Sequence, residues 1–581
     1  MPHGIHADCG TGSAVCRRIG GTGMNITCYP GTLGGTVAAI PSKSDAHRKL
    51  ICAALSANGG MLPLRAPYCD DIAATIRCLT ELGAGFSQSA EGLTVIPINR
   101  QSHAELDCGE SGSTLRFLLP VAMAVCGDIS VRGKGRLPER PIDTLVEAMS
   151  AHGVQFAQTK LPLSASGALT GGSYEIAGNI SSQFLSGLLM ALPLCAEDSE
   201  ITLITPLQSS AYVDMTLETL RLFHVEINVD MDENGNPHYQ IPGGQIYWMP
   251  EHMIIDGDWS NAAFWLAAGA LQDTPVSVTG LNAESVQGDK AIAKILADAG
   301  ANVENYGNVL NVSCGTIDEI NADMEKIPDL LPILAVRASL GTGESHFTNA
   351  ERLRLKESDR LAATAKLLRD LGGRVDENPD GLSVYGEQLT GGTVDGMNDH
   401  RLVMAAAIAA LRCEQPVTIL GAEAVNKSYP AFFEDYRALG GWCEESEVLP
   451  DGNVKNQANT KIAELKAASD PAERNRIALE ISDARYHAAA PALVELILEN
   501  RSTNNIGTMV YALENLECAD EISELLPLAF HGNWETRHEL MTLFAAKFPQ
   551  MSADSQARCR ELFARERNQA EETIAQLGKY M

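Results

Sequence analysis

The chain has 581 residues and a mass of 62.1 kDa, which is too long for one compact core, so we expect several domains. Hydrophobic residues make up 45% and charged residues 20%, a balance that excludes a disordered or low-complexity chain. The net charge of -30 argues against nucleic acid as a partner, because contacts with the phosphate backbone need a basic surface.

Cysteine usage and hydropathy restrict the class further. The 14 cysteines are scattered with no C-x-x-C pair, so the sequence indicates neither a zinc ribbon nor a disulfide framework and fits a reducing cytoplasm. The longest apolar runs, 117–125 and 184–195, are shorter than a membrane span, so no membrane partner is expected. Residues 1–23 contain no apolar segment of signal-peptide length, and we expect them to be a leader without regular structure.

An amphipathic helix with a glycine at its end recurs along the chain. The end positions are separated by 70, 71, 76, 72 and 68 residues. They are Gly83, Gly153, His224, Gly300, Gly372 and Gly440. Glycine there adopts the left-handed conformation that closes a helix, and a strand-like stretch follows each copy.

A second kind of helix interleaves with the first and is apolar on nearly every face after a polar start. Its copies align at Ser44, Ser113, Ser182, Ser260, Asp329 and Asp399. Helices that are apolar all round are buried, and Ser or Asp at a helix start accepts hydrogen bonds from the free amides of the first turn. Six copies, each with a buried helix, a surface helix and short strands, predict an α/β fold of two lobes with three units each.

The polar starts of the buried helices also collect unusual side chains. They are Lys43, Arg48, Arg116, Gln183, Asp329, His400 and Arg401. A helix N-terminus favours an anion, because its unpaired N–H groups and the positive end of its dipole point the same way. For a single copy, a capped helix beside a surface charge is an equally good interpretation. The repetition in an acidic chain favours a cleft that binds a small, multiply anionic ligand.

Six ordered motifs carry a resemblance to a known family. They are Ser42 through Arg48, Gly109 through Arg116, Arg136 through Pro141, Ser181 through Phe184, Lys356 through Arg360, and Asn398 through Arg401. Over about residues 24–447 they resemble the EPSP synthases (3-phosphoshikimate 1-carboxyvinyltransferases) of the enolpyruvyl transferase family. The resemblance implies a two-lobed inside-out α/β barrel with helices buried inside. We expect residues 24–40 and 253–447 to form the first lobe and residues 41–252 the second.

The resemblance also implies the reaction. The enolpyruvyl group of phosphoenolpyruvate passes to the 5-hydroxyl of shikimate 3-phosphate and phosphate leaves, in the pathway to chorismate and aromatic amino acids. This addition and elimination needs no metal or organic cofactor. Asp329 matches the carboxylate that handles the hydroxyl proton, Glu357 matches the acid–base group near the methylene carbon, and Lys43 would lie between the substrates. Two carboxylates among several cations can be held at different proton affinities, as separate acid and base roles require.

The remaining ligands follow from matching positions in the family. The resemblance places shikimate 3-phosphate against Lys43, Ser44, Arg48, Ser181, Ser182, Gln183, Ser209, Tyr212, Asp329 and Lys356. It places phosphoenolpyruvate against Lys43, Gly112, Arg136, Gln183, Arg360, Arg401 and Lys427. Arg suits such positions because its planar fork grips a carboxylate or phosphate with two bonds. At Gly112 a side chain would fill space that the ligand needs.

Some of these assignments have plain alternatives. Lys356, Glu357 and Arg360 have the i, i+1 and i+4 spacing that is also typical of a solvated ion pair at a helix start. His400 belongs to a residue type that caps or packs more often than it catalyses. The segment around Ser209 offers two adjacent serines.

The chain also departs from the family pattern. Glu110 stands where many members have Asn, and Arg352 stands where an Asn often helps to bind shikimate 3-phosphate. Phe117 follows Arg116 where Pro is frequent. Arg116 and Arg140 would serve equally well to orient their neighbours.

Two other functions compete with this interpretation. UDP-N-acetylglucosamine enolpyruvyl transferase shares the fold, but its family has a reactive cysteine before the Arg-Pro element, and residues 133–141 contain none. The second competing interpretation is a catalytically inactive scaffold. The presence of Lys43, Asp329, Glu357 and Lys427 together argues against it.

The C-terminal part lies outside the resemblance. We expect a linker at 448–457 and an all-helical extension at 458–581, whose paired helices are similar to HEAT repeats in pattern only. Such stacks commonly bind other proteins, so the extension is interpreted as a docking or self-association module, with an inert helical appendage as an equal alternative. The catalytic core is expected to be a monomer.

Overall fold

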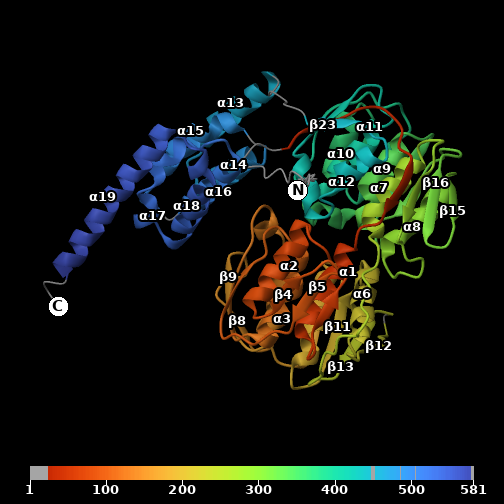
Figure 1. Cartoon of the computed structure of the whole chain (residues 1–581), viewed down its shortest axis with the longest axis horizontal. Coiled ribbons are helices and arrows are strands. Elements are labelled where there is room, and N and C mark those ends of the chain that lie inside the picture. The colour runs from red at the N-terminus through yellow and green to blue at the C-terminus, as the bar shows by residue number, and fades with distance from the viewer. Residues whose placement is uncertain (1–23, 234, 446–451, 485, 504, 578–581) are drawn as a thin grey trace, which may run out of the picture. The chain divides into compact units, whose positions relative to one another are not determined.

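The computed structural model describes residues 24–445 except 234, and residues 452–577 except 485 and 504. The expected leader, 1–23, lies outside these residues. The chain forms two compact units, of which one spans Met24–Ser446 and the other contains the C-terminal helices. The larger unit has two lobes, coloured red to yellow and green to teal in Figure 1.

The second lobe repeats one arrangement of a buried helix, a surface helix and a small sheet. The first copy contains α1 (Lys43–Leu55), β3 (Gly60–Leu62), α2 (Asp70–Glu81), β4 (Gly85–Gln88) and β5 (Leu93–Ile96). The second contains β6 (Ala104–Asp107), α3 (Gly112–Val125), β7 (Asp128–Arg132), the 3-10 helix η1 (Leu137–Glu139), α4 (Asp143–Ser150), β8 (Val154–Phe156) and β9 (Leu163–Gly167). The third contains β10 (Gly172–Ala177), α5 (Ser182–Ala191), η2 (Leu192–Leu194), β11 (Ser199–Thr205), α6 (Ser210–Leu222), β12 (Asn228–Met231) and β13 (Pro237–Ile241).

The first lobe repeats the same arrangement with help from the N-terminal strands β1 (Ile26–Cys28) and β2 (Gly35–Ala38). Its first copy contains α7 (Trp259–Gly269), β14 (Val276–Thr279), η3 (Gly288–Lys290), α8 (Ala291–Asp298), β15 (Asn302–Asn305) and β16 (Val309–Ser313). The second contains β17 (Asn321–Asp323), η4 (Pro328–Leu330), α9 (Leu331–Ser339), β18 (Glu344–Thr348), η5 (Glu351–Leu355), α10 (Arg360–Asp370), β19 (Arg374–Asn378) and β20 (Gly381–Tyr385). The third contains β21 (Gly392–Asp395), α11 (His400–Ala410), β22 (Val417–Leu420), η6 (Ala422–Lys427), α12 (Phe432–Ala438) and β23 (Cys443–Glu445).

Within residues 24–445 the strands form six sheets, one for each copy. In each four-stranded sheet a parallel pair is joined to antiparallel neighbours. For example, β6 runs parallel to β7 with Ala104 opposite Ile129, and β9 and β8 follow in antiparallel pairing. β2 completes the sheet of β14, while β1 lies between β22 and β23. The predicted α/β fold of two lobes with three units each is confirmed.

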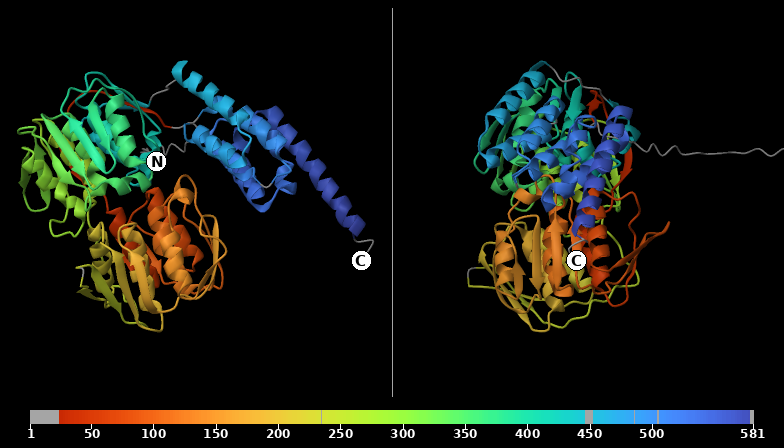
Figure 2. Two further views of the ribbon diagram at one scale, coloured as in Figure 1. Left: turned by 180° about the vertical axis from the view of Figure 1, so that it is seen from behind. Right: turned by 90° about the vertical axis from the view of Figure 1, so that its left-hand side faces the viewer.

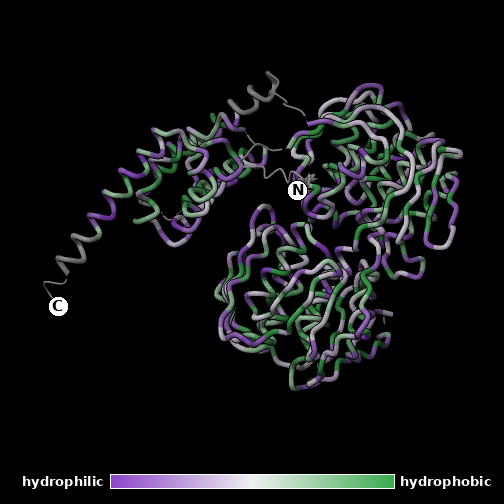
Figure 3. The backbone as a smooth tube through the Cα atoms, in the orientation of Figure 1, coloured by the Kyte–Doolittle hydropathy of each residue, from purple (hydrophilic) through white to green (hydrophobic). Residues whose placement is uncertain are grey.

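The buried helices meet inside each lobe. Helix α3 contacts α1 and α5 in the second lobe, and α7, α9 and α11 contact one another in the first, with the sheets around them (Figure 2). Leu50, Phe117 and Phe184 are almost fully buried there. Figure 3 shows apolar residues concentrated within each lobe. Because each lobe buries three helices inside and places its sheets around them, the inside-out barrel is also confirmed.

All six predicted helix ends have the left-handed conformation. The φ angles are 100° at Gly83, 91° at Gly153, 61° at His224, 89° at Gly300, 86° at Gly372 and 98° at Gly440. His224 adopts it without glycine's freedom, because the repeated packing of helix against strand imposes the same turn on each copy.

The chain crosses between the lobes in two segments that lie side by side. The amide of Ser42 donates to the carbonyl of Asp256 (2.7 Å), and that of Asp258 donates to the carbonyl of Ile40 (2.8 Å). The Asp258 carboxylate caps α7 and also accepts from the amide of Lys43 (3.0 Å). These contacts hold the starts of α1 and α7 next to each other, one from each lobe.

Within its described residues, the extension consists of helices around a core of its own. They are α13 (Gly452–Ala467), α14 (Pro471–Asp483), η7 (His487–Ala489), α15 (Ala490–Glu499), α16 (Gly507–Ala512), η8 (Leu513–Asn515), η9 (Glu521–Leu525), α17 (Leu528–His531), α18 (Trp534–Lys547), η10 (Phe548–Gln550) and α19 (Ala553–Leu577). Of the linker expected at 448–457, residues 452–457 belong to α13, and residues 448–451 lie outside the described residues. None of the described helices of the chain combines the length and apolar character of a bilayer crossing.

Candidate active site

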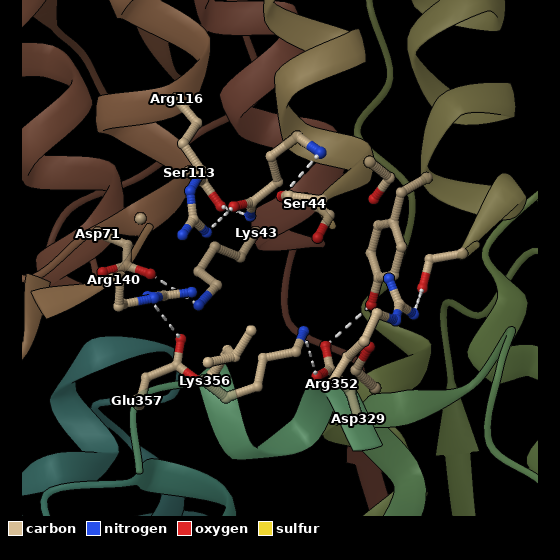
Figure 4. A pocket seen from close by; sticks show the side chains of 18 of the residues that line it. Lys43, Ser44, Asp71, Ser113, Arg116, Arg140, Asp329, Arg352, Lys356 and Glu357 are labelled. Carbon is tan, nitrogen blue, oxygen red and sulfur yellow. Dashed lines mark hydrogen bonds and ion pairs between the residues drawn. The ribbon is translucent and has the colours of Figure 1, made fainter. Parts of the chain in front are cut away.

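The starts of the buried helices line one pocket between the two lobes (Figure 4). Among its described lining residues, eight are Lys or Arg and four are Asp or Glu, in a chain of net charge -30. The cations are Lys43, Arg48, Arg116 and Arg140 from the second lobe and Arg352, Lys356, Arg360 and Arg401 from the first. Such a local excess of positive charge, focused between two lobes, favours a small ligand with several negative charges.

Helix α1 presents Lys43 and Ser44 to the pocket. Ser42 caps the helix by accepting from the amide of Asp45, so the next serine, Ser44, is free to line the pocket. The Lys43 ammonium lies 2.8 Å from the Asp71 carboxylate. Burial is the largest single effect and would lower the pKa of Lys43, but the charges of Asp71, Cys69 and Glu357, together with the hydrogen bond to Asp71, outweigh it and raise the pKa. Lys43 is therefore a fixed cation in this arrangement.

Arg48 also lines the pocket, but its guanidinium is bonded within the second lobe. Its Nε donates to Thr216 Oγ1, its Nη1 to the carbonyl of Ser44 and its Nη2 to the carbonyl of Tyr212, each at 2.7 Å. Burial lowers the pKa of Arg48 to about 10. Arg48 ties α1 to α6 and so fixes the positions of Ser44 and Tyr212.

Helices α3 and α5 hold an amide between a cation and a hydroxyl. Gln183 Oε1 accepts from Arg116 Nη1 (2.7 Å), and Gln183 Nε2 donates to Ser113 Oγ (2.9 Å). Ser181 caps α5, and Ser182 begins the helix at the pocket wall. The Nε of Arg116 is buried and has no hydrogen-bond partner among the described residues.

The close approach of α3 and α5 follows from two residues inside them. Pro120 has no N–H to donate to the carbonyl of Arg116, four residues earlier. Gly187 of α5 lies against that carbonyl, since a Cβ on Gly187 would be 2.3 Å from its oxygen. This contact fixes the helix start that carries Arg116.

Asp329 is the carboxylate with the most cationic partners. Its Oδ1 accepts from Arg360 Nη1 (2.7 Å) and Lys356 Nζ (3.4 Å), and its Oδ2 accepts from Arg401 Nη2 (3.0 Å) and Tyr212 OH (2.9 Å). Burial would raise the pKa of Asp329, but the charges of Arg401, Lys356 and Arg360 outweigh it and hold the pKa well below its ordinary value. Asp329 is thus an ionised proton acceptor in this arrangement.

Glu357 lies between arginines from both lobes. Its Oε2 lies 2.6 Å from Arg360 Nη2, and its Oε1 lies 3.7 Å from Arg140 Nη1, as Figure 4 shows for Arg140. Burial would raise the pKa of Glu357, but the charges of Arg360 and Arg140, with a smaller effect from Lys356, hold it well below its ordinary value. Anions that pair with these arginines would weaken that effect and raise the pKa, which a proton-donating role requires.

Asp399 anchors Arg360 and caps α11. It accepts from Arg360 Nε (2.9 Å) and Nη2 (3.2 Å), a two-point contact that fixes the guanidinium plane. The next residue, His400, is buried, and neither ring nitrogen has a hydrogen-bond partner among the described residues. Burial, and then the charges of Lys43 and Arg401, hold the pKa of His400 well below its ordinary value, so its imidazole is neutral.

The structure brings Arg140, rather than the expected Arg136, into the pocket. The Arg136 side chain is 40% exposed and pairs with Glu139 on the same short turn (3.4 Å), whereas that of Arg140 is 8% exposed and faces Glu357. The turn η1 separates the two arginines and directs them differently. A Cβ on Gly112 would be 2.6 Å from Arg140 Nη1, so Gly112, which lines the pocket as expected, also makes room for this side chain.

Lys427 is the other predicted residue outside the pocket lining. Its Nζ donates to the carbonyl of Asn398 (2.6 Å) and pairs with Glu110 (2.5 Å). The other predicted site residues all line the pocket, with Ser209 donating to the carbonyl of Glu325 (3.1 Å).

Asp71 and Arg352 are among the pocket residues to which sequence reasoning assigned no role. Arg352 Nη2 donates to Ser209 Oγ (2.7 Å), and Asp71 pairs with Lys43. For Arg352 the sequence did offer a signal, because Arg stands at a position where Asn often occurs in the family. Asp71 is one of two adjacent acids at the start of α2, and only the fold shows which faces Lys43.

Comparison with known proteins extends these observations. A family model described as EPSP synthase (3-phosphoshikimate 1-carboxyvinyltransferase) matches residues 29–436. A 3-phosphoshikimate 1-carboxyvinyltransferase of Clostridium kluyveri is 39% identical over 429 residues, covering 73% of this chain and 99% of that protein. One from Clostridioides difficile is 38% identical over 437 residues, covering 72% and 98%.

Solved structures agree on the fold. The EPSP synthase from Acinetobacter baumannii superposes with a TM-score of 0.61 at 24% identity, covering 73% of this chain and 100% of that one. The enolpyruvyl transferase NikO from Streptomyces tendae gives 0.58 at 17% identity, covering 74% and 100%. The matched family region ends before the C-terminal extension.

Proposed function

Because the chain belongs to the EPSP synthase family, we propose that the pocket between its lobes holds both substrates and divides the reaction among its residues. The reaction transfers the enolpyruvyl group of phosphoenolpyruvate to the 5-hydroxyl of shikimate 3-phosphate and releases phosphate, a step of the shikimate pathway.

One observation carries the assignment of the pocket. Among the described residues, Arg116 Nε, Arg140 Nε, Arg401 Nη1 and both ring nitrogens of His400 are buried without a hydrogen-bond partner. Buried donors left unpaired cost stability, and those of the three arginines carry positive charge. Two phosphate groups and a carboxylate supply the acceptors that they lack.

Asp329 acts on the hydroxyl in this proposal. The 5-hydroxyl oxygen attacks the central carbon of phosphoenolpyruvate, and Asp329 takes the hydroxyl proton. Tyr212 donates to Asp329 Oδ2 and fixes its direction. Arg360, Lys356 and Arg401 keep the carboxylate ionised before substrate binds. Substrate anions that pair with these cations raise its proton affinity, which is what a base needs.

Glu357 acts on the methylene carbon. It delivers a proton there as the carbon–oxygen bond forms, and it takes one back as phosphate leaves and the double bond returns. Arg360 and Arg140 face Glu357 from the two lobes, so binding of phosphoenolpyruvate to them couples substrate entry to the protonation of Glu357. Lys43, paired with Asp71, lies between the substrates and stabilises the phosphate that leaves.

The two substrates then occupy different walls. Shikimate 3-phosphate lies against the starts of α1 and α5, where Ser44, Ser181, Ser182 and Gln183 surround two helix N-termini. Its other contacts are Ser209, Tyr212, Arg352 and Lys356. Phosphoenolpyruvate lies against Arg140, Arg360 and Arg401, with Arg140 in place of Arg136 and with Lys427 at the edge.

The test uses the purified full-length chain and measures phosphate release. We expect release with phosphoenolpyruvate and shikimate 3-phosphate and none with UDP-N-acetylglucosamine as acceptor. Lys43→Met should abolish turnover, while Lys160→Met, at an exposed lysine of the same lobe, should leave it unchanged. Equal release with both acceptors, or an active Lys43→Met variant, would contradict the proposal.

A further inference from the structure

Glu110 joins the two lobes at a place that the proposed mechanism does not use. It lies in the second lobe between β6 and the α3 cap, and it does not line the pocket. Its Oε2 accepts from Lys427 Nζ (2.5 Å) and from Asn398 Nδ2 (2.8 Å), both in the first lobe. The Glu110 side chain is 25% exposed and that of Lys427 is 10% exposed, so solvent screens this contact less than a surface ion pair.

The turn that Glu110 grips is strained and leads into the active site. Met397 and Asn398 have φ angles of 49° and 52°, which are uncommon for residues other than glycine. The next residues, Asp399 and His400, begin α11, and Arg401 follows. Lys427 donates to the carbonyl of Asn398 (2.6 Å), so Glu110 and Lys427 hold this turn from both its side chain and its backbone.

Glu110 is itself supported by its neighbours. A Cβ on Gly135, whose φ is 59°, would be 2.6 Å from the Glu110 carboxyl carbon, so the loop at 133–135 backs the carboxylate. Asp70 lies near the same cations, since Lys134 and Lys427 both lower its pKa against the larger effect of burial, which raises it. Two carboxylates and two lysines thus form one cluster where α2 meets η6.

We propose that Glu110 is a positioning residue that clamps Lys427 and the Met397–Asn398 turn, and thereby fixes the start of α11 for phosphoenolpyruvate. This rests on the proposed function, in which Arg401 and Lys427 bind that substrate. The carboxylate holds the lysine ammonium in one place and so removes freedom that binding would otherwise have to restrict.

Steady-state kinetics of Glu110→Gln and Glu110→Asn test the clamp. We expect the KM for phosphoenolpyruvate to rise about tenfold, because a hydrogen bond to a charged group is lost. The KM for shikimate 3-phosphate and kcat should change less than about twofold, since their residues do not touch Glu110. Glu139→Gln is the matched control, because Glu139 is an exposed acid of the same lobe that pairs only with Arg136 among the described residues, and it should leave all three constants unchanged.

A double-mutant cycle shows whether Glu110 acts through Lys427 or weakens substrate binding in some other way. In a Lys427→Gln background, Glu110→Gln should add little to the KM for phosphoenolpyruvate, since the ammonium partner is already gone and the amide oxygen of Gln can still accept from Asn398. An unchanged KM in both Glu110 variants would overturn the clamp. So would a tenfold rise that persists in the Lys427→Gln background, or an equal rise in both substrates' KM. Wild-type turnover tests the assigned reaction separately, so an active wild type with a normal Glu110→Gln variant overturns the clamp alone.

Discussion

The two lobes repeat the same unit but offer different chemistry to the pocket. In the second lobe the buried helices are capped by Ser42, Ser111 and Ser181. In the first lobe Asp258 and Asp399 cap α7 and α11. A neutral serine satisfies an amide but leaves the positive helix end uncompensated, whereas an aspartate neutralises that end and can also hold a cation.

This difference separates binding from acid–base chemistry. The second lobe turns serine-capped helix ends and single cations toward the pocket, as an anion site requires. The first lobe uses Asp399 to lock Arg360, and Arg360 contacts both Asp329 and Glu357. A repeated backbone thus supplies equivalent positions, and the residue at the cap decides what each position does.

Among these predictions, the largest effect on turnover is expected from changing Asp329, a carboxylate of the first lobe. Asp329→Asn keeps the shape and removes the base, so we expect kcat to fall by about 10²–10⁴-fold, the usual contribution of a positioned proton acceptor. Binding of shikimate 3-phosphate, measured by calorimetry, should change little, because the proposed arrangement places its phosphate against the second lobe. Turnover close to wild type would remove Asp329 from the mechanism and would end the division of labour between the lobes.

The second prediction tests which arginine the second lobe contributes. Arg140→Ala should raise the KM for phosphoenolpyruvate by about 100-fold, since a charged contact facing Glu357 is lost from a buried site. Arg136→Ala is its matched control, four residues away and exposed, and should change the same KM less than about twofold. The reverse result would restore the expectation from sequence and would require η1 to rearrange on binding.

A buried histidine of the second lobe, His47, makes the stability of that lobe depend on pH. His47 in α1 bonds to Thr75 (2.8 Å), and burial lowers its pKa to about 3. The unfolded chain binds the proton of His47 more tightly than the folded chain does. The contribution of neutral, buried His47 to the free energy of unfolding is therefore present above about pH 6.5 and is lost as the pH falls toward 3. At pH 4.5 the loss is about 2.7 kcal/mol.

Urea unfolding of wild type and His47→Gln at pH 7 and pH 4.5 checks this. The glutamine variant should lose less stability than wild type over that interval, by up to about 2.7 kcal/mol. Equal losses in the two proteins would show that other groups cause the acid sensitivity of the second lobe.

Local signals allowed much of the fold to be predicted from the sequence. The period of about seventy residues and the six helix ends depend on residues close together in the chain, so His224 could be placed from its neighbours alone. Paired serines such as Ser42 and Ser44 marked the starts of the three buried helices in the second lobe. Which serine caps and which faces the pocket depends on the first turn's geometry, and the alignment at Ser44 identified the pocket-facing residue instead of the cap.

The remaining site features depend on contacts between distant segments. Arg136 and Arg140 flank one short turn, and only its packing against α3 decides which one reaches Glu357. The pairing of Glu110 with Lys427 joins residues 317 apart in sequence, and no periodicity marks it. Sequence reasoning therefore found the helices that carry the chemistry more easily than the loops that adjust it.

The smallest effect on turnover is expected from the extension. Every described residue that lines the pocket lies between Lys43 and Arg401, and the helices after residue 452 enclose their own core. We expect a chain truncated after Asn453 to keep kcat and both KM values within about twofold of wild type. Because Trp534 and Met541 are exposed on α18, we expect docking or self-association to be lost, as measured by sedimentation of both chains. A truncated chain that folds, as judged by circular dichroism, yet loses turnover would show that the extension completes the active site and that the two lobes are not sufficient.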